Sequence, residues 1–168
     1  MDSSVWIDFF SSAPGRAGDE LRRMIEDAEP FALTGVVVTE ILQGLTRNAS
    51  KIEHYLAQWE MLEPLGFSTY REAAAIFRLG HARGVSLTTI DALIAAIALE
   101  HSARVFTLDK DFTRIARLTR LPLHQTAIGP GDRVGEARSR RGRCHRAGNV
   151  GRKAIVKRDP STCWGRSG

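Results

Sequence analysis

The chain has 168 residues, 43% of them hydrophobic, which is enough for one domain with a sizeable core and short for two. Residues 131–168 carry a net charge of +8 within a total of +5, so residues 1–130 have a net charge of −3. Both cysteines lie in that basic segment, so no disulfide framework supports the rest, and we expect a soluble cytoplasmic protein. The longest apolar run, Ala92–Leu99, is too short to cross a membrane.

Taken in chain order, the apolar pattern predicts strands and helices that alternate. The expected strands are residues 3–10, 30–34, 104–107 and 121–124, with 61–66 as a short strand or loop. The expected helices are residues 19–28, 36–45, 48–59, 69–83, 88–99 and 112–118. Such alternation favours a parallel sheet with helices on its faces, so we predict an α/β fold.

Two of these helices have an amphipathic pattern. In residues 19–28 the apolar side chains share one face and the charges are expected on the opposite one. In residues 69–83 the expected inner face is formed by Ala73, Ile76, Phe77 and Gly80.

The stretch 87–112 organises the rest of the chain. Thr88 and Asp91 have the spacing of a capping box, and the eight residues Ala92–Leu99 include no polar side chain, so we expect a buried helix. Asp109 and Asp111 follow the next predicted strand at its carboxyl end, where open α/β sheets form their sites. The start of the helix and the end of the strand therefore can bring two carboxylates into one crevice.

Four acidic residues adjoin apolar segments that should enter the core: Asp2, Glu40, Asp91 and Asp109. Carboxylates gathered without a counter-ion disfavour each other's ionised form, and a divalent cation would offset this. Mg²⁺ and Mn²⁺ prefer carboxylate oxygens and can activate water for hydrolysis of a phosphodiester. Each of the four also has a structural explanation: a frayed terminus for Asp2, a solvated helix position for Glu40, a helix cap for Asp91 and a turn for Asp109. The nearby Asp111 suits a helix N-cap.

The four acidic motifs resemble those of PIN-domain ribonucleases, above all the VapC-type toxins of bacterial toxin–antitoxin pairs. The motifs are DSSVWIDF from Asp2, VVVTEILQGL around Glu40, TTIDALIAAIAL around Asp91 and TLDKDF from Thr107. The resemblance covers about residues 1–125 and implies a three-layer α/β/α sandwich with a mostly parallel sheet. It also implies a nuclease domain over residues 1–128.

What the resemblance implies for function is endonucleolytic cleavage of RNA that depends on Mg²⁺ or Mn²⁺. The metal-binding acids would be Asp2, Glu40, Asp91 and Asp109. Ser4 would orient the first acid, Thr107 would stand beside the fourth, and Asp111 would be an auxiliary ligand. The expected partners are an RNA substrate, a small antitoxin and a second copy of the chain, with no membrane.

Two departures from the family pattern leave alternatives open. Only Met1 precedes Asp2, so a shortened first strand would instead give a catalytically inactive module that binds RNA or the antitoxin. A structure-specific DNA nuclease is a further alternative.

The Arg/Gly-rich residues 129–168 have no counterpart in the family, and we expect a disordered basic tail. Without that tail, access of the substrate to the site would depend on basic residues of the domain: Arg71, Arg78, Arg83, Lys110 and Arg114.

Overall fold

The computed structural model describes residues 1–45 and 48–125, which belong to the first of the chain's two units, Met1–Asp132. The predicted tail 129–168 and the predicted boundary at residue 128 lie outside the described residues. The described helices are α1 (Ser3–Phe9), α2 (Arg16–Glu26), α3 (Gly35–Gln43), α4 (Ala49–Leu56), α5 (Phe67–Ala82), α6 (Thr89–Glu100) and α7 (Lys110–Leu118). None of them combines the length and the apolar character that crossing a bilayer requires.

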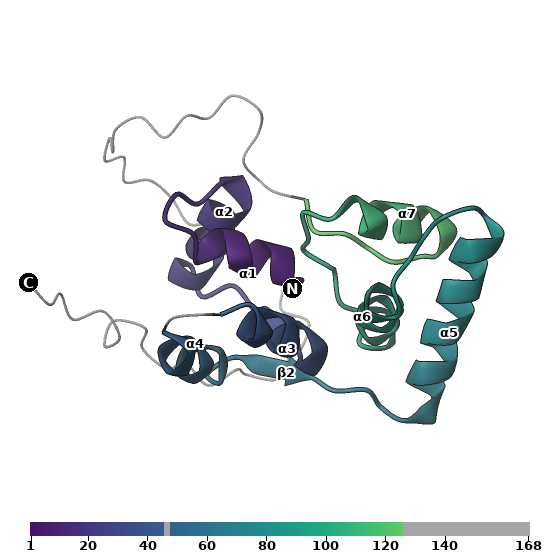
Figure 1. Ribbon diagram of the computed structural model, residues 1–168, viewed down its shortest axis with the longest axis horizontal. Coiled ribbons are helices and arrows are strands. Elements are labelled where there is room, and N and C mark those ends of the chain that lie inside the picture. Colours follow the sequence, from purple (N-terminus) through teal and green to yellow (C-terminus); the bar gives the residue numbers. More distant parts are fainter. Residues whose placement is uncertain (46–47, 126–168) are drawn as a thin grey trace, which may run out of the picture. The chain divides into compact units, whose positions relative to one another are not determined.

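The described strands, β1 (Ala32–Thr34) and β2 (Glu60–Leu62), form a parallel pair in which Ala32 faces Glu60 and Thr34 faces Leu62. The helices α3 and α4 connect them along the chain (Figure 1). A parallel connection of this kind needs a crossover, and helices usually provide it. The predicted strand at 30–34 and the possible strand at 61–66 are therefore confirmed in type.

A third extended segment lies on the other side of β1. The nitrogen of Met1 donates a hydrogen bond to the Ala32 carbonyl at 2.9 Å, and the amide of Asp2 donates to the Phe106 carbonyl at 2.9 Å. Neighbouring residues of an extended chain direct their amides to opposite sides. Met1 and Asp2 therefore lie between β1 and the segment that contains Phe106, which is how Asp2 reaches the end of the 104–107 segment.

The predicted strands 104–107 and 121–124 are shorter than expected. They are joined by one parallel bridge, Val105 to Leu123, with hydrogen bonds from the Val105 amide to Pro122 and from the His124 amide to Val105. The two segments run parallel to each other, as a parallel sheet requires. Their regular pairing is limited to one residue on each segment. Single backbone hydrogen bonds from Met1 and Asp2 thus link the two-stranded sheet of β1 and β2 to these two bridged segments.

The predicted strand at residues 3–10 is wrong, because these residues form the helix α1. Val5 and Trp6 are fully buried and Phe9 is partly buried, whereas Ile7 is 60% exposed. Burial at positions 5, 6 and 9 follows the helical repeat and not the alternation of a strand. The ring of Trp6 packs against Phe9 and three further aromatic rings: Phe10, Phe31 and Tyr55.

The other predicted helices are confirmed in type as α2, α3, α4, α5, α6 and α7. The helix α6 is the most buried, with six buried residues between Ala92 and Ala98, and it packs against α5. On α5, Ala73, Ile76 and Gly80 are buried as expected, but Phe77 is 37% exposed, so its place on the inner face is wrong.

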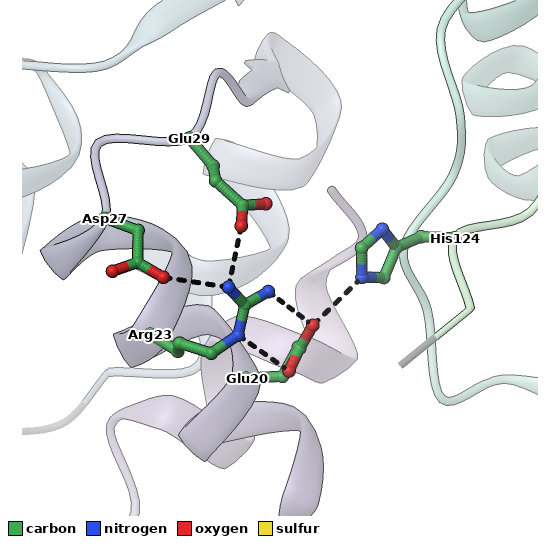
Figure 2. Close-up of polar contacts among 5 residues, drawn as sticks. All are labelled: Glu20, Arg23, Asp27, Glu29 and His124. Atoms are coloured by element: carbon green, nitrogen blue, oxygen red, sulfur yellow. Dashed lines mark hydrogen bonds and ion pairs between the residues drawn. The ribbon is translucent and has the colours of Figure 1, made fainter. Parts of the chain in front are cut away.

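The charge distribution predicted for α2 is wrong at one residue, since Glu20 is fully buried beside the apolar side chains. Its carboxylate accepts two hydrogen bonds from Arg23, at 2.9 and 3.3 Å, and its Oε1 lies 3.5 Å from Nε2 of His124. Figure 2 shows the same guanidinium shared with Asp27 and Glu29. Because the pairing neutralises the buried charge, Glu20 can link α2 to the segment that contains His124.

Candidate active site

The carboxylate of Asp2 is the centre of the candidate site. The residue is 5% exposed, and its Oδ2 atom accepts hydrogen bonds from the hydroxyls of Ser4 at 2.6 Å and Thr107 at 2.8 Å. The backbone of Asp2 is extended, and the chain turns into α1 directly after it, which places Ser4 beside the carboxylate. Two hydroxyl donors on one oxygen hold this buried carboxylate in a single orientation.

Backbone amides determine the direction of both hydroxyls. The Leu108 amide donates to Ser4 Oγ at 3.1 Å, and the Asp109 amide donates to Thr107 Oγ1 at 2.9 Å. Since each hydroxyl oxygen accepts one of these bonds, its proton is free to point at Asp2. The site therefore joins the N-terminal residues to the loop before α7, across more than 100 positions of sequence.

Asp109 is exposed and is the N-cap residue of α7, where its Oδ1 atom accepts the amide of Asp111 at 2.8 Å. The expectation that Asp111 is the N-cap is therefore wrong. Asp111 lies in the first turn instead, and its Oδ1 atom is 2.5 Å from Nη1 of Arg114. The sequence pattern did not reveal this ion pair, although the three-residue spacing on a helix permits it.

Asp91 begins α6 in the capping box that the sequence predicts. Its amide donates to Thr88 Oγ1 at 3.0 Å, while its Oδ2 atom accepts the amide of Thr88 at 3.1 Å and the hydroxyl of Thr88 at 2.5 Å. In the described part of the chain, these bonds engage one carboxylate oxygen of Asp91. The capping role is established, and it leaves the second oxygen for other chemistry.

Glu40 is half-buried on α3, a helix capped by the Thr34 side chain through the amide of Val37 at 3.4 Å. α3 packs against α1, which carries Ser4, and against α6, which carries Asp91. The helix that carries Glu40 thus packs against two helices that begin at or next to the predicted acids Asp2 and Asp91. Among residues 1–45 and 48–125, however, Glu40 takes part in no hydrogen bond or ion pair with them.

The structure thus brings Asp2, Ser4, Thr107 and Asp109 into one hydrogen-bonded network, and it places Glu40 and Asp91 on neighbouring helices. Over the described residues, no three His, Cys, Asp or Glu side chains form a group arranged to hold a metal ion. The donors themselves suit a hard divalent cation, because all four are carboxylates and Asp2 is buried with its orientation fixed. The four-acid metal set remains a prediction.

A family model of the PIN domain matches residues 1–118. The chain belongs to the PIN-domain family. Its relatives include the VapC ribonuclease Mb1587 of Mycobacterium bovis and ribonuclease VapC11 of Mycobacterium tuberculosis. Each is 34% identical over 125 residues, which cover 72% of this chain and 93% of the relative. These matches confirm the VapC-type PIN resemblance that the four motifs indicate.

Among solved structures, the chain resembles FitAcB from Neisseria gonorrhoeae, with a TM-score of 0.57 and 19% sequence identity. The likeness covers 74% of this chain and 95% of the other. At this identity it bears on the fold, and together with the family match it confirms the predicted α/β class. The short parallel sheet with helices around it is this PIN domain's form of the three-layer sandwich.

Proposed function

We propose that this chain is a metal-dependent endoribonuclease and the toxin of a toxin–antitoxin pair. The observation that supports it most directly is the buried Asp2 carboxylate, held by the hydroxyls of Ser4 and Thr107 within a PIN domain. The related proteins are named as ribonucleases and align over nearly their whole length.

In this proposal Asp2, Glu40, Asp91 and Asp109 hold Mg²⁺ or Mn²⁺. When bound, such an ion lowers the pKa of water and offsets the negative charge that develops on the phosphoryl group. Ser4 and Thr107 keep the Asp2 carboxylate oriented through their hydroxyl hydrogen bonds. Asp91 and Asp109 contribute while they cap α6 and α7, so their carboxylates are positioned by the helices they begin.

The alternative is a PIN module that binds RNA or an antitoxin without cutting. It is favoured by one observation: within the described residues, no three His, Cys, Asp or Glu side chains form a group that could hold a metal ion. The two functions differ in whether the pure protein cleaves RNA when Mg²⁺ or Mn²⁺ is present.

The proposed partners are an antitoxin, which would silence the enzyme in the cytoplasm, and a second copy of the chain. Exposed apolar side chains offer a surface for such contacts, since Leu65, Phe67 and Tyr70 are 68%, 82% and 52% exposed. Phe67 and Tyr70 lie three positions apart on α5 and therefore share a face. Light scattering of the purified chain measures whether it is a dimer.

The decisive experiment is cleavage of total RNA by the purified full chain, with Mg²⁺, with Mn²⁺ and with a chelator. Asp91→Asn is the site variant. Asp27→Asn is the control, because Asp27 is 57% exposed, pairs with Arg23 and is not one of the four proposed metal ligands. Discrete, metal-dependent cuts that Asp91→Asn abolishes support the proposal. A well-folded protein that does not cut supports the binding module, and cutting of DNA in preference to RNA supports a DNA nuclease.

A further inference from the structure

A continuous series of contacts connects a cation to the Asp2 carboxylate. Arg114 pairs with Asp111, the amide of Asp111 donates to Asp109, the amide of Asp109 donates to Thr107, and Thr107 donates to Asp2. Within residues 1–45 and 48–125, Arg114 is the only basic side chain in this series, in which the two middle links are donated by backbone amides. The other members of the series are acids or a hydroxyl.

This arrangement bears on how RNA can approach the site. The proposed function, on which this inference rests, requires a phosphodiester to come close to Asp2, Asp109 and other carboxylates. Like charges repel, and a cation at a fixed position beside the acids offsets that repulsion for one phosphate. The network leads from the acids to such a cation.

The geometry of Arg114 suits it to bind phosphate. Its side chain is 54% exposed, so the guanidinium is accessible, while Nη1 is held by Oδ1 of Asp111 one helical turn away. A guanidinium has five N–H donors in a planar fork, and the contact with Asp111 uses one of its nitrogens. The remaining donors can bind two oxygens of a phosphate without losing the ion pair.

We propose that Arg114 binds a backbone phosphate of the RNA substrate at the candidate site, and that Asp111 is a positioning residue that orients its guanidinium. Asp111 then acts on the substrate through Arg114 and is not a metal ligand, which departs from the auxiliary role that the family resemblance implies. A merely structural ion pair on the surface of α7 would contribute little to RNA binding.

The test measures RNA binding without metal, so that it does not depend on cleavage. A fluorescent single-stranded RNA is titrated with the full chain in the presence of chelator, over a range of salt concentrations, and the anisotropy gives Kd. Arg114→Gln is compared with Arg117→Gln, an exposed arginine three positions further along the same helix. Any contribution of residues 126–168 to binding is common to all variants. Circular dichroism verifies that each variant is folded.

We expect Arg114→Gln to weaken binding about fivefold or more and to reduce the salt slope by about 0.7, the value for one phosphate contact on a single strand. Arg117→Gln should change Kd less than about twofold. Arg114→Lys should fall between the wild-type chain and Arg114→Gln, because it keeps the charge and loses the fork. Equal effects of the two Gln variants would overturn the proposal.

Asp111→Asn gives the sharper result, because two explanations predict opposite signs. Removing a negative charge near the RNA should strengthen binding if Asp111 does not orient Arg114. If Asp111 positions the guanidinium, the same variant should weaken binding. Tighter binding by Asp111→Asn would overturn the positioning role. A chain that binds RNA through Arg114 and never cleaves it would refute the proposed enzyme and leave this inference standing.

Discussion

The hydroxyl of Thr107 donates a 2.8 Å hydrogen bond to Oδ2 of Asp2, although the two residues are 105 positions apart in the sequence. The bond exists because Asp2 is paired through its amide to Phe106, the residue before Thr107. The short sheet therefore determines the geometry of the candidate site. One side chain from the first acidic motif and one from the last are brought together by backbone hydrogen bonds.

The first prediction concerns this hydroxyl. Thr107→Val removes the donor to Asp2 at almost constant volume, and we expect RNA cleavage to fall about 10- to 100-fold, the usual effect of losing a partner that orients a metal-binding side chain. Thr107→Ser keeps the hydroxyl and should retain most of the activity. Initial cleavage rates at saturating Mn²⁺ measure the effect, and a Val variant as active as the Ser variant would show that the bond is dispensable.

A second prediction separates the two roles of Asp91. Thr88→Ala removes the hydroxyl of the capping box, and should lower the free energy of unfolding by about 1 kcal/mol while cleavage persists. Asp91→Asn keeps a capping side chain and should cost less stability, yet it should abolish cleavage. Urea unfolding and RNA cleavage on both variants give the comparison. If cleavage falls only in proportion to stability in both variants, Asp91 acts as a helix cap and has no separate role in cleavage.

The third prediction uses two acids that share Arg23 (Figure 2). Glu20 is fully buried and Asp27 is 57% exposed, so the same ion-pair chemistry is found in two environments. Glu20→Ala should destabilise the chain by about 3 kcal/mol, because it removes a buried partner of Arg23 and leaves a cavity. Asp27→Ala should cost less than about 1 kcal/mol. Similar losses in urea unfolding would mean that burial does not matter here.

Much of the fold was predictable because long segments carry one strong signal. The absence of polar residues from Ala92–Leu99 and the Thr88–Asp91 spacing indicate a buried, capped helix, and α6 is that helix. The stretch after Asp2 was misassigned because its apolar residues are nearly continuous, and such a run fits a strand or a helix equally. The tertiary contacts of Trp6 and Phe9 with other aromatic rings select the helix.

The metal-binding role of the four acids stays a prediction, and the hydrogen bonds around Asp2 were predictable only in part. The hydrogen bond from Ser4 to Asp2 is local, and the family resemblance implies that Ser4 orients this acid. The hydrogen bond from Thr107 to Asp2 depends on extended segments that are distant in sequence, so the sequence pattern does not reveal it. The pairing of Asp111 with Arg114 is local, but a sequence does not show which of several partners an acid selects. Glu20 was missed because its burial depends on Arg23 and on His124 from the last segment.

The last prediction concerns Glu100 at the end of α6. The hydroxyl of Thr69 donates a 2.6 Å hydrogen bond to Oε2 of Glu100 and lowers the pKa of this carboxyl below its usual 4.5. Partial desolvation raises the pKa and so opposes this effect, while the 3.2 Å hydrogen bond from the amide of Leu65 lowers the pKa further. A lowered pKa means that the folded chain binds fewer protons than the unfolded chain. The carboxylate therefore stabilises the fold above the unfolded pKa, and this contribution is lost as pH falls through the folded pKa.

Glu100→Gln should accordingly lower the urea midpoint at about pH 7, and this deficit should be smaller at about pH 3.5, which lies below the unfolded pKa. The amide can still accept a hydrogen bond from Thr69, so the remaining difference reports the charge. Glu72→Gln, an exposed change on α5, is the matched control and should shift the midpoint little at either pH. A Glu100→Gln deficit of the same size at both pH values would attribute the effect to packing and not to ionisation.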